Sequence, residues 1–155
     1  MMLCSRCCNR KLQFVTDSDL IAASFELAAE RCSDLTPLVY KRLFEGHPDM
    51  EALFIRDKTH AVKGEMLARV IEAILDFVGE RNYAARLIQC EVVTHAGYDV
   101  PMDVFGVFFD VVASALRDLL GANWSPEIAG AWERTLLGLH YYVSHPDQSQ
   151  TANVL

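Results

Sequence analysis

Apolar residues recur at intervals of three and four along most of the chain between Thr16 and Ser144, which is the spacing of amphipathic helices. A first helix is predicted to begin at the capping candidates Thr16 to Ser18, and its buried face is formed by Ile21, Phe25, Ala28 and Cys32. A second helix has Pro37 in its first turn, where proline is tolerated, and ends at Gly46. Its inward positions are predicted to be Leu35, Leu38, Val39 and Leu43.

Three further segments lead up to residue 97. A short helix is predicted from Pro48 to Phe54. After a polar link, a longer helix spans Val62 to Gly79, with core-facing residues at Val62, Met66, Val70, Ile74 and Phe77. The segment from Asn82 to Ala96 fits a helix closed by Gly97, although the β-branched residues at 92–94 would also permit a short strand. We favour the helix.

Two long helices complete the pattern. Pro101 opens an apolar stretch that ends at Gly121, and apolar residues cover most of its circumference, which predicts burial on two sides. The last helix begins at the cap and first-turn residues Ser125, Pro126 and Glu127, and turns Ile128, Trp132, Leu136 and Leu139 inward. Because neither a β-α-β alternation nor a repeat of 20 to 50 residues is present, the sequence predicts an all-α fold of six or seven helices.

One domain over residues 16–144 accounts for these helices, between an N-terminal cysteine-containing extension (1–15) and a flexible polar tail (145–155). Hydrophobic residues make up 52% of the 155 residues, but no uncharged apolar stretch reaches the ~18 residues that a membrane span needs. The N-terminus lacks the features of a secretory signal, so we expect a cytoplasmic protein. A formal net charge of -7 argues against a nucleic-acid partner, since phosphate binding favours a basic surface.

The five cysteines are an odd number, which argues against a closed disulfide framework. Cys4 and Cys7 form a C-x-x-C pair, but no second pair completes a zinc site, and Cys8 stands where covalent haem attachment requires histidine. A redox-sensitive thiol cluster, an acylated membrane tether next to basic residues, and a disordered tail remain open. Cys32 and Cys90 are predicted to be small buried groups.

His95 lies between an apolar stretch and a glycine in the segment VVTHAGYDVP. A histidine in such a place is more often a core residue than a ligand, so its assignment needs other residues. Upstream, Leu35, Thr36 and Tyr40 form an L-T-x-x-x-Y motif, and Phe44, Pro48 and Phe54 follow as F-x-x-x-P-x-x-x-x-x-F. In this order, and with a proline soon after the histidine, the residues from 16 to 144 resemble the globin family, specifically bacterial single-domain globins and the haem domain of flavohaemoglobins.

The resemblance implies a globin fold of six to eight helices around a haem pocket, with haem b as the cofactor. His95 would be the proximal iron ligand, and its other ring nitrogen would need an acceptor, most simply a backbone carbonyl one turn earlier. Phe54 would pack on the porphyrin, while Tyr40 would direct its hydroxyl at a bound ligand or, alternatively, reach the protein surface. The further cofactor contacts implied are Tyr98, Val100 and Phe105.

The distal side departs from the family pattern. Lys63 occupies the position usually held by histidine or glutamine, and Leu67, one turn on, stands where an apolar residue contacts the ligand. The Lys63 stem could lie along the pocket wall with its ammonium in water or on a haem propionate, or an uncharged Lys63 could bind iron as a sixth ligand. His60 lies on the same stripe and could swing in as a distal ligand or stay solvated in its loop.

The function implied first is reversible binding of dioxygen, or of nitric oxide or carbon monoxide, for storage, scavenging or sensing. One alternative is a haem-free globin-like sensor or interaction module, and another is nitric oxide dioxygenation. The enzyme normally uses a proximal Tyr-Glu network and a reductase domain; here Phe105 stands at the tyrosine position, Asp147 falls near the acid, and a separate reductase would be needed. The last two helices could also form a homodimer surface.

Overall fold

The computed structural model describes residues 14–145, and every structural statement below concerns that range. These residues form six α-helices and two short 3-10 helices, and no β-strand occurs among them. The elements are α1 (Asp17–Arg31), α2 (Thr36–Gly46), η1 (Pro48–Phe54), α3 (Ala61–Val78), α4 (Ala84–Ala96), α5 (Met102–Leu120), η2 (Gly121–Asn123) and α6 (Pro126–Ser144). The predicted all-α fold is therefore confirmed, and the segment that leads into His95 is a helix rather than a strand.

Local capping explains where the first and last helices begin. The Thr16 hydroxyl accepts a hydrogen bond from the Asp19 amide at 3.2 Å, and the Asp19 carboxylate accepts one from the Thr16 amide at 2.8 Å. At the start of α6, the Ser125 hydroxyl accepts a hydrogen bond from the amide of Ile128 at 3.3 Å. These bonds satisfy amides that have no partner within the helix, as the sequence pattern predicts.

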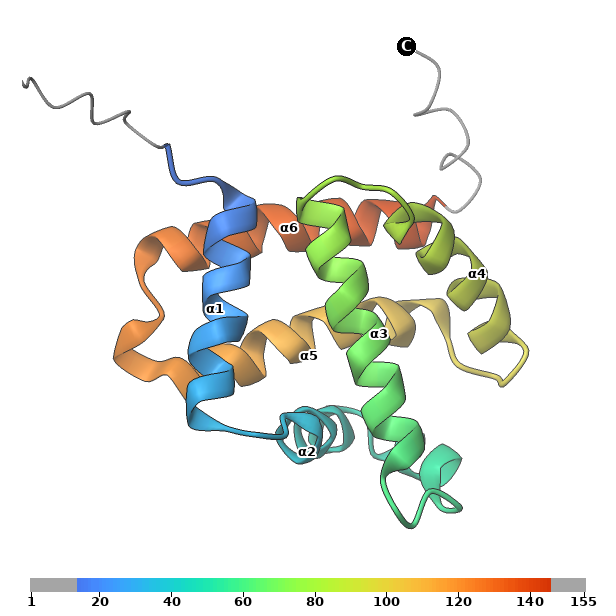
Figure 1. The fold of residues 1–155 in the computed structure, drawn as a ribbon. Coiled ribbons are helices and arrows are strands. Elements are labelled where there is room, and N and C mark those ends of the chain that lie inside the picture. The colour runs from blue at the N-terminus through green and yellow to red at the C-terminus, as the bar shows by residue number, and fades with distance from the viewer. Residues whose placement is uncertain (1–13, 146–155) are drawn as a thin grey trace, which may run out of the picture.

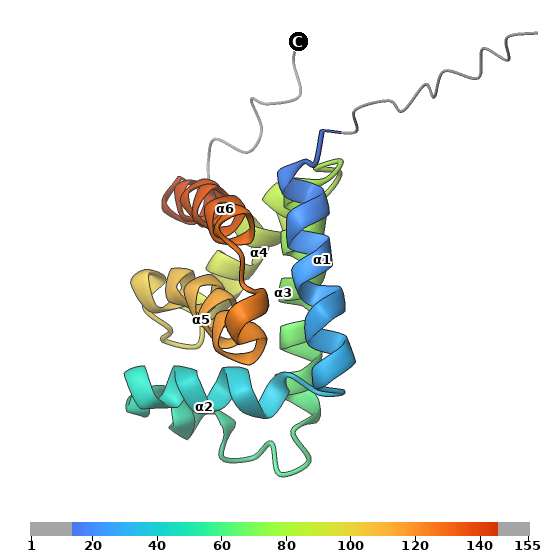
Figure 2. The same ribbon diagram turned by 90° about the vertical axis from the view of Figure 1, so that its left-hand side faces the viewer.

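The helices form two crossing layers (Figures 1 and 2). α1 and α3 make one layer and α5 and α6 the other, while α2 runs across one end. α5 packs against α1, α2, α4 and α6. Its burial by several neighbours agrees with the apolar residues predicted around most of its circumference.

Four predicted core positions need correction. Leu38 is 41% exposed and Val62 is 54% exposed. Cys90 is exposed and Cys32 only partly buried. The buried positions of α4 are Ala84, Ile88 and Val92, spaced by four residues, so Cys90 falls on the opposite side of the helix. Val62 lies in the first turn of α3, before Leu67, the first buried apolar residue of that helix.

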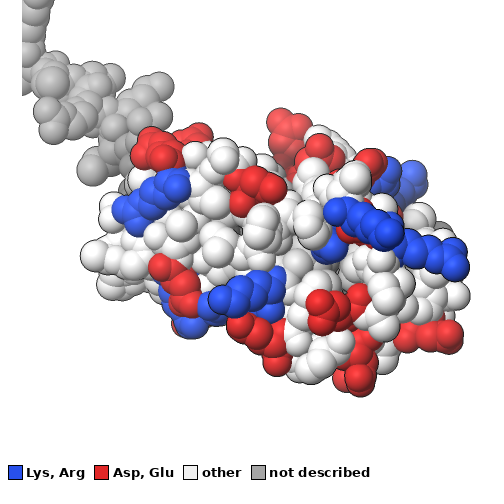
Figure 3. All heavy atoms as spheres, turned by 90° about the horizontal axis from the view of Figure 1, so that it is seen from below, with Lys and Arg blue, Asp and Glu red and all other residues white. Residues whose placement is uncertain are grey.

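On the face drawn in Figure 3, Lys and Arg side chains lie among Asp and Glu side chains rather than gathering in one area. No helix within residues 14–145 is both long enough and apolar enough to cross a bilayer. The cluster Cys4, Cys7 and Cys8 lies outside the described residues, as does Asp147, and the interpretations placed on them stay predictions.

Candidate functional site

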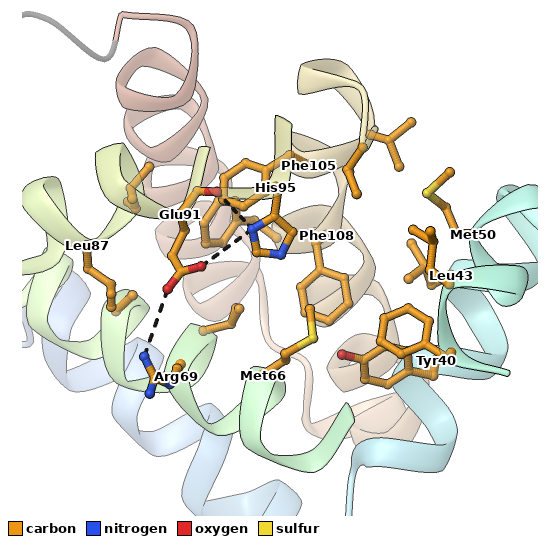
Figure 4. A pocket seen from close by; sticks show the side chains of 18 residues that line it. Tyr40, Leu43, Met50, Met66, Arg69, Leu87, Glu91, His95, Phe105 and Phe108 are labelled. Carbon is orange, nitrogen blue, oxygen red and sulfur yellow. Dashed lines mark hydrogen bonds and ion pairs between the residues drawn. The ribbon is translucent and has the colours of Figure 1, made fainter. Parts of the chain in front are cut away.

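An apolar pocket lies among α2, η1, α3, α4 and α5 (Figure 4). Its cavity volume is about 120 Å³, within a larger hollow of about 850 Å³ that includes open solvent. Aliphatic and aromatic side chains make up most of its wall, and a few polar groups interrupt it, chiefly His95, Glu91, Arg69 and Tyr40. A mainly apolar cavity with a few polar groups is the usual form of a site for a small molecule or cofactor.

His95 occupies the last turn of α4 and lines the pocket. Its Nδ1 lies 2.8 Å from the backbone carbonyl oxygen of Glu91, which is the acceptor expected one turn earlier. In a neutral ring, this bond places the proton on Nδ1 and leaves Nε2 with its lone pair. Nε2 has no hydrogen-bond partner among the described residues. The ring also packs against Phe105, with 5.0 Å between ring centroids.

A carboxylate that the sequence analysis missed lies beside the imidazole. Glu91 Oε2 is 3.4 Å from His95 Nδ1, and Glu91 Oε1 is 3.9 Å from Arg69. Arg69 also approaches Glu65 at 3.6 Å, so the two carboxylates flank one guanidinium. Figure 4 shows Glu91 reaching from α4 toward Arg69 on α3. The i to i+4 spacing of Glu91 and His95 on a predicted helix could have identified this pair.

Tyr40 stands on the opposite wall and is only 2% exposed. Its ring contacts Phe54 and Phe108, with centroid separations of 5.2 and 5.5 Å. Its hydroxyl is buried without a hydrogen-bond partner within the described part of the chain, and Figure 4 shows it directed toward Met66. Burial raises the pKa of Tyr40, and the nearby negative charge of Asp57 adds to the effect, so the group stays a neutral O–H donor.

Three of the other predicted contacts also reach the pocket. Phe54 ends η1 and lines the cavity, and its ring lies 5.8 Å from that of Phe44. Val100, in the link after α4, and Phe105, in the first turns of α5, line it as well. These residues come from three different segments, and the fold brings them to one cavity.

Lys63 is 8% exposed and is not among the residues that line the pocket. Its ammonium lies 3.7 Å from the Asp57 carboxylate. His60 is exposed in the turn before α3, with a left-handed φ of 61°. Neither side chain enters the cavity in this structure.

Two predicted contacts lie elsewhere. Leu67 is buried in the helical core, and Met66 is the residue that faces the pocket from that turn of α3. Tyr98 is 70% exposed, in the turn after α4, and does not line the cavity. Phe108, which the sequence analysis did not single out, lines the pocket between Tyr40 and Phe105.

Comparisons with known proteins agree with this architecture. The family model described as Globin matches residues 38–140. Among curated proteins, a flavohemoprotein of Halalkalibacterium halodurans is 22% identical over 116 residues, which cover 73% of this chain and 28% of that protein. The chain thus matches little more than a quarter of the length of this relative. No solved structure gives a significant match. The matched segment runs from α2 into α6 and includes the whole pocket wall, and the chain belongs to the globin family.

Proposed function

We propose that the chain binds haem b in this pocket, with His95 as the proximal iron ligand, and that it reversibly binds a diatomic ligand such as dioxygen. The observation that carries the proposal is the state of His95. Its Nδ1 is committed to the Glu91 carbonyl at 2.8 Å, and its Nε2 is left without a partner at the wall of an apolar cavity. A hydrogen bond on one ring nitrogen fixes the tautomer and orients the other nitrogen for a metal.

The rest of the pocket fits such a group. Haem, when bound, supplies an iron centre able to hold a diatomic gas. Phe54, Phe105 and Phe108 offer flat apolar surfaces to a macrocycle. The Tyr40 hydroxyl, buried and without an acceptor, can donate a hydrogen bond to a ligand that carries partial negative charge.

A haem-free interaction module is the alternative that this arrangement disfavours. Buried polar atoms in native proteins are nearly always hydrogen-bonded, so an orphaned hydroxyl points to a missing partner. Tyr40, which lines the pocket, carries such a hydroxyl among the described residues. A module that works through its surface has no use for either feature.

The test is a titration of the purified haem-free protein with haem, followed by ferric, ferrous and carbon monoxide spectra. We expect one haem per chain and a sharp Soret band that shifts with carbon monoxide. His95→Ala should lose this spectrum, whereas His140→Ala should keep it, because His140 pairs with Asp110 at 2.7 Å on α5 and does not line the pocket. A free-haem spectrum that is indifferent to His95 would instead support the interaction module.

Nitric oxide dioxygenation with a separate reductase is a second candidate, favoured by the Glu91 carboxylate 3.4 Å from His95 Nδ1. An acceptor on this nitrogen makes the imidazole a stronger electron donor. Phe105, at the expected tyrosine position, has no hydroxyl to extend the network. The test measures nitric oxide consumption in the presence of dioxygen and a reductant. Glu91→Gln should slow consumption if this function holds, and an unchanged rate would count against it.

A further inference from the structure

We propose that Asp57 is a positioning residue that holds the Lys63 ammonium outside the pocket and so keeps the side opposite His95 open to a small external ligand. The inference rests on the proposed haem function. It assigns a role to a residue that neither the sequence motifs nor the pocket lining single out.

Lys63 lies on the stripe of α3 that faces the cavity. Met66, Val70 and Ala73 line the pocket, and they stand three, seven and ten residues after Lys63. Residues at these spacings share one face of a helix. Lys63 is thus placed one turn before the pocket wall, and yet its own side chain is absent from the lining.

The ammonium is held just behind the wall. Lys63 Nζ lies 3.7 Å from Asp57 Oδ2, and the two side chains are only 9% and 5% exposed. The same atom lies 5.5 Å from the centre of the Phe54 ring, which itself lines the pocket. One aromatic ring therefore separates the amine from the cavity.

Asp57 is itself fixed in place by the start of α3. Its two carboxylate oxygens accept hydrogen bonds from the amides of Val62 and Lys63, at 3.2 and 3.0 Å. Burial raises the pKa of Asp57, but these bonds and the positive charges of Lys63 and His60 outweigh it and hold the pKa below its usual value. The carboxylate thus stays ionised at neutral pH and offers the ammonium a rigid counterion.

The chemistry of the amine explains why this position matters. An ammonium has three donors and no lone pair, so it cannot coordinate iron while it is paired with Asp57. Without the carboxylate, the Lys63 ammonium would lose the charged partner that holds it. A Lys63 amine that has given up its proton has a lone pair able to bind iron, and its stem starts from the face of α3 that lines the pocket.

The main experiment compares four haem-reconstituted proteins: the native chain, Asp57→Asn, Lys63→Met and the double variant. The readouts are the ferrous visible spectrum and the rate of carbon monoxide binding after flash photolysis. We expect the native chain and Lys63→Met to show an open sixth position. Asp57→Asn should show six-coordinate ferrous bands, with binding slowed about tenfold if nine-tenths of the molecules are closed. The double variant should return to native behaviour.

Two results would overturn the proposal. The first is an Asp57→Asn protein with native spectra, because Lys63 would then stay outside without Asp57. The second is a spectral change that persists in the double variant, because Asp57 would then act through the start of α3 rather than through Lys63. Should Asp57→Asn not fold, Asp57→Ser removes the charge and keeps an oxygen that can cap the helix, and it carries the same expectations.

A measurement without haem separates this proposal from the proposed function. The acetylation rate of Lys63 by an N-hydroxysuccinimide ester is followed by mass spectrometry in the haem-free protein. The acetylation rate of Lys41, whose side chain is 75% exposed, serves as the internal reference. Relative to this reference, the rate at Lys63 should be several-fold higher in Asp57→Asn than in the native chain. If no variant binds haem but this rate rises, the proposed function fails and the hold on Lys63 stands; an unchanged rate contradicts the hold itself.

Discussion

Replacing Tyr40 by phenylalanine should stabilise the haem-free protein and weaken its hold on dioxygen once haem is bound. The substitution removes only the hydroxyl, since the ring contacts with Phe44, Phe54 and Phe108 do not involve it. That hydroxyl is buried without a partner within residues 14–145. An unsatisfied buried polar group costs about 1–3 kcal/mol, so Tyr40→Phe should raise the free energy of unfolding by an amount in that range.

When a ligand is bound, the loss of the Tyr40 hydroxyl is expected to be unfavourable rather than favourable. A hydrogen bond to a charged group contributes about 1.5–3 kcal/mol, which corresponds to a dioxygen dissociation rate that is faster by about 10- to 150-fold in Tyr40→Phe. The assays are urea unfolding of the haem-free proteins and stopped-flow displacement of dioxygen from the loaded ones. Carbon monoxide carries less charge when bound, so its dissociation should change much less.

Tyr83→Phe is the matched control. Tyr83 is 45% exposed, and its hydroxyl donates a long 3.4 Å hydrogen bond to the carbonyl oxygen of Glu72, away from Tyr40. The free energy of unfolding should therefore change by less than about 0.5 kcal/mol. A haem-free Tyr40→Phe protein that is less stable than the native chain would refute the claim that the Tyr40 hydroxyl lacks a hydrogen-bond partner. An unchanged dioxygen dissociation rate would refute its proposed role toward the ligand.

Two further predictions concern the scaffold. A Cβ at Gly138 would lie 2.7 Å from the Phe77 ring, so Gly138→Ala should lower the free energy of unfolding by about 1–3 kcal/mol. Gly46→Ala should not lower it, because a Cβ at Gly46 would meet no atom within 4 Å. Urea unfolding of both variants checks this prediction. Asp76 accepts hydrogen bonds from three backbone amides before and at the start of α4, and these outweigh burial, which raises its pKa, so that the pKa of Asp76 is lowered. A lowered folded-state pKa contributes stability above the unfolded pKa of about 3.9 that is lost as pH falls through the folded value, so Asp76→Asn should flatten the acid side of the stability profile; an unchanged slope below about pH 4 would contradict this.

Local chemistry explains why the helix boundaries could be predicted. Ser125 caps the start of α6, and Pro126 is tolerated in its first turn. Gly79 and Gly121 are the residues at which α3 and α5 end. The interpretation of His95 as a ligand was based on its order along the chain after two upstream motifs. Such features depend on neighbours in sequence and need no knowledge of tertiary packing.

The parts that could not be predicted depend on helix rotation and on loops. Successive residues of a helix point about 100° apart, so an error of one residue in the register of α3 exchanges Leu67 for Met66 at the pocket wall. Asp57 meets Lys63 only because the turn before α3 folds back through the left-handed residue His60. Nothing in a periodic pattern encodes that turn. Tyr98 also lies in a turn, next to the left-handed residue Asp99, and its exposure is not encoded by the pattern either.

The central claim is that His95 supplies the nitrogen that binds the haem iron. It can be tested by removing the imidazole side chain and supplying free imidazole in solution. His95→Gly removes the imidazole and leaves a space that added imidazole can enter. We expect haem-loaded His95→Gly to lose the native ferrous and carbon monoxide spectra and to regain them on titration with imidazole. Native spectra in His95→Gly without imidazole would contradict the account, because another residue would then hold the iron.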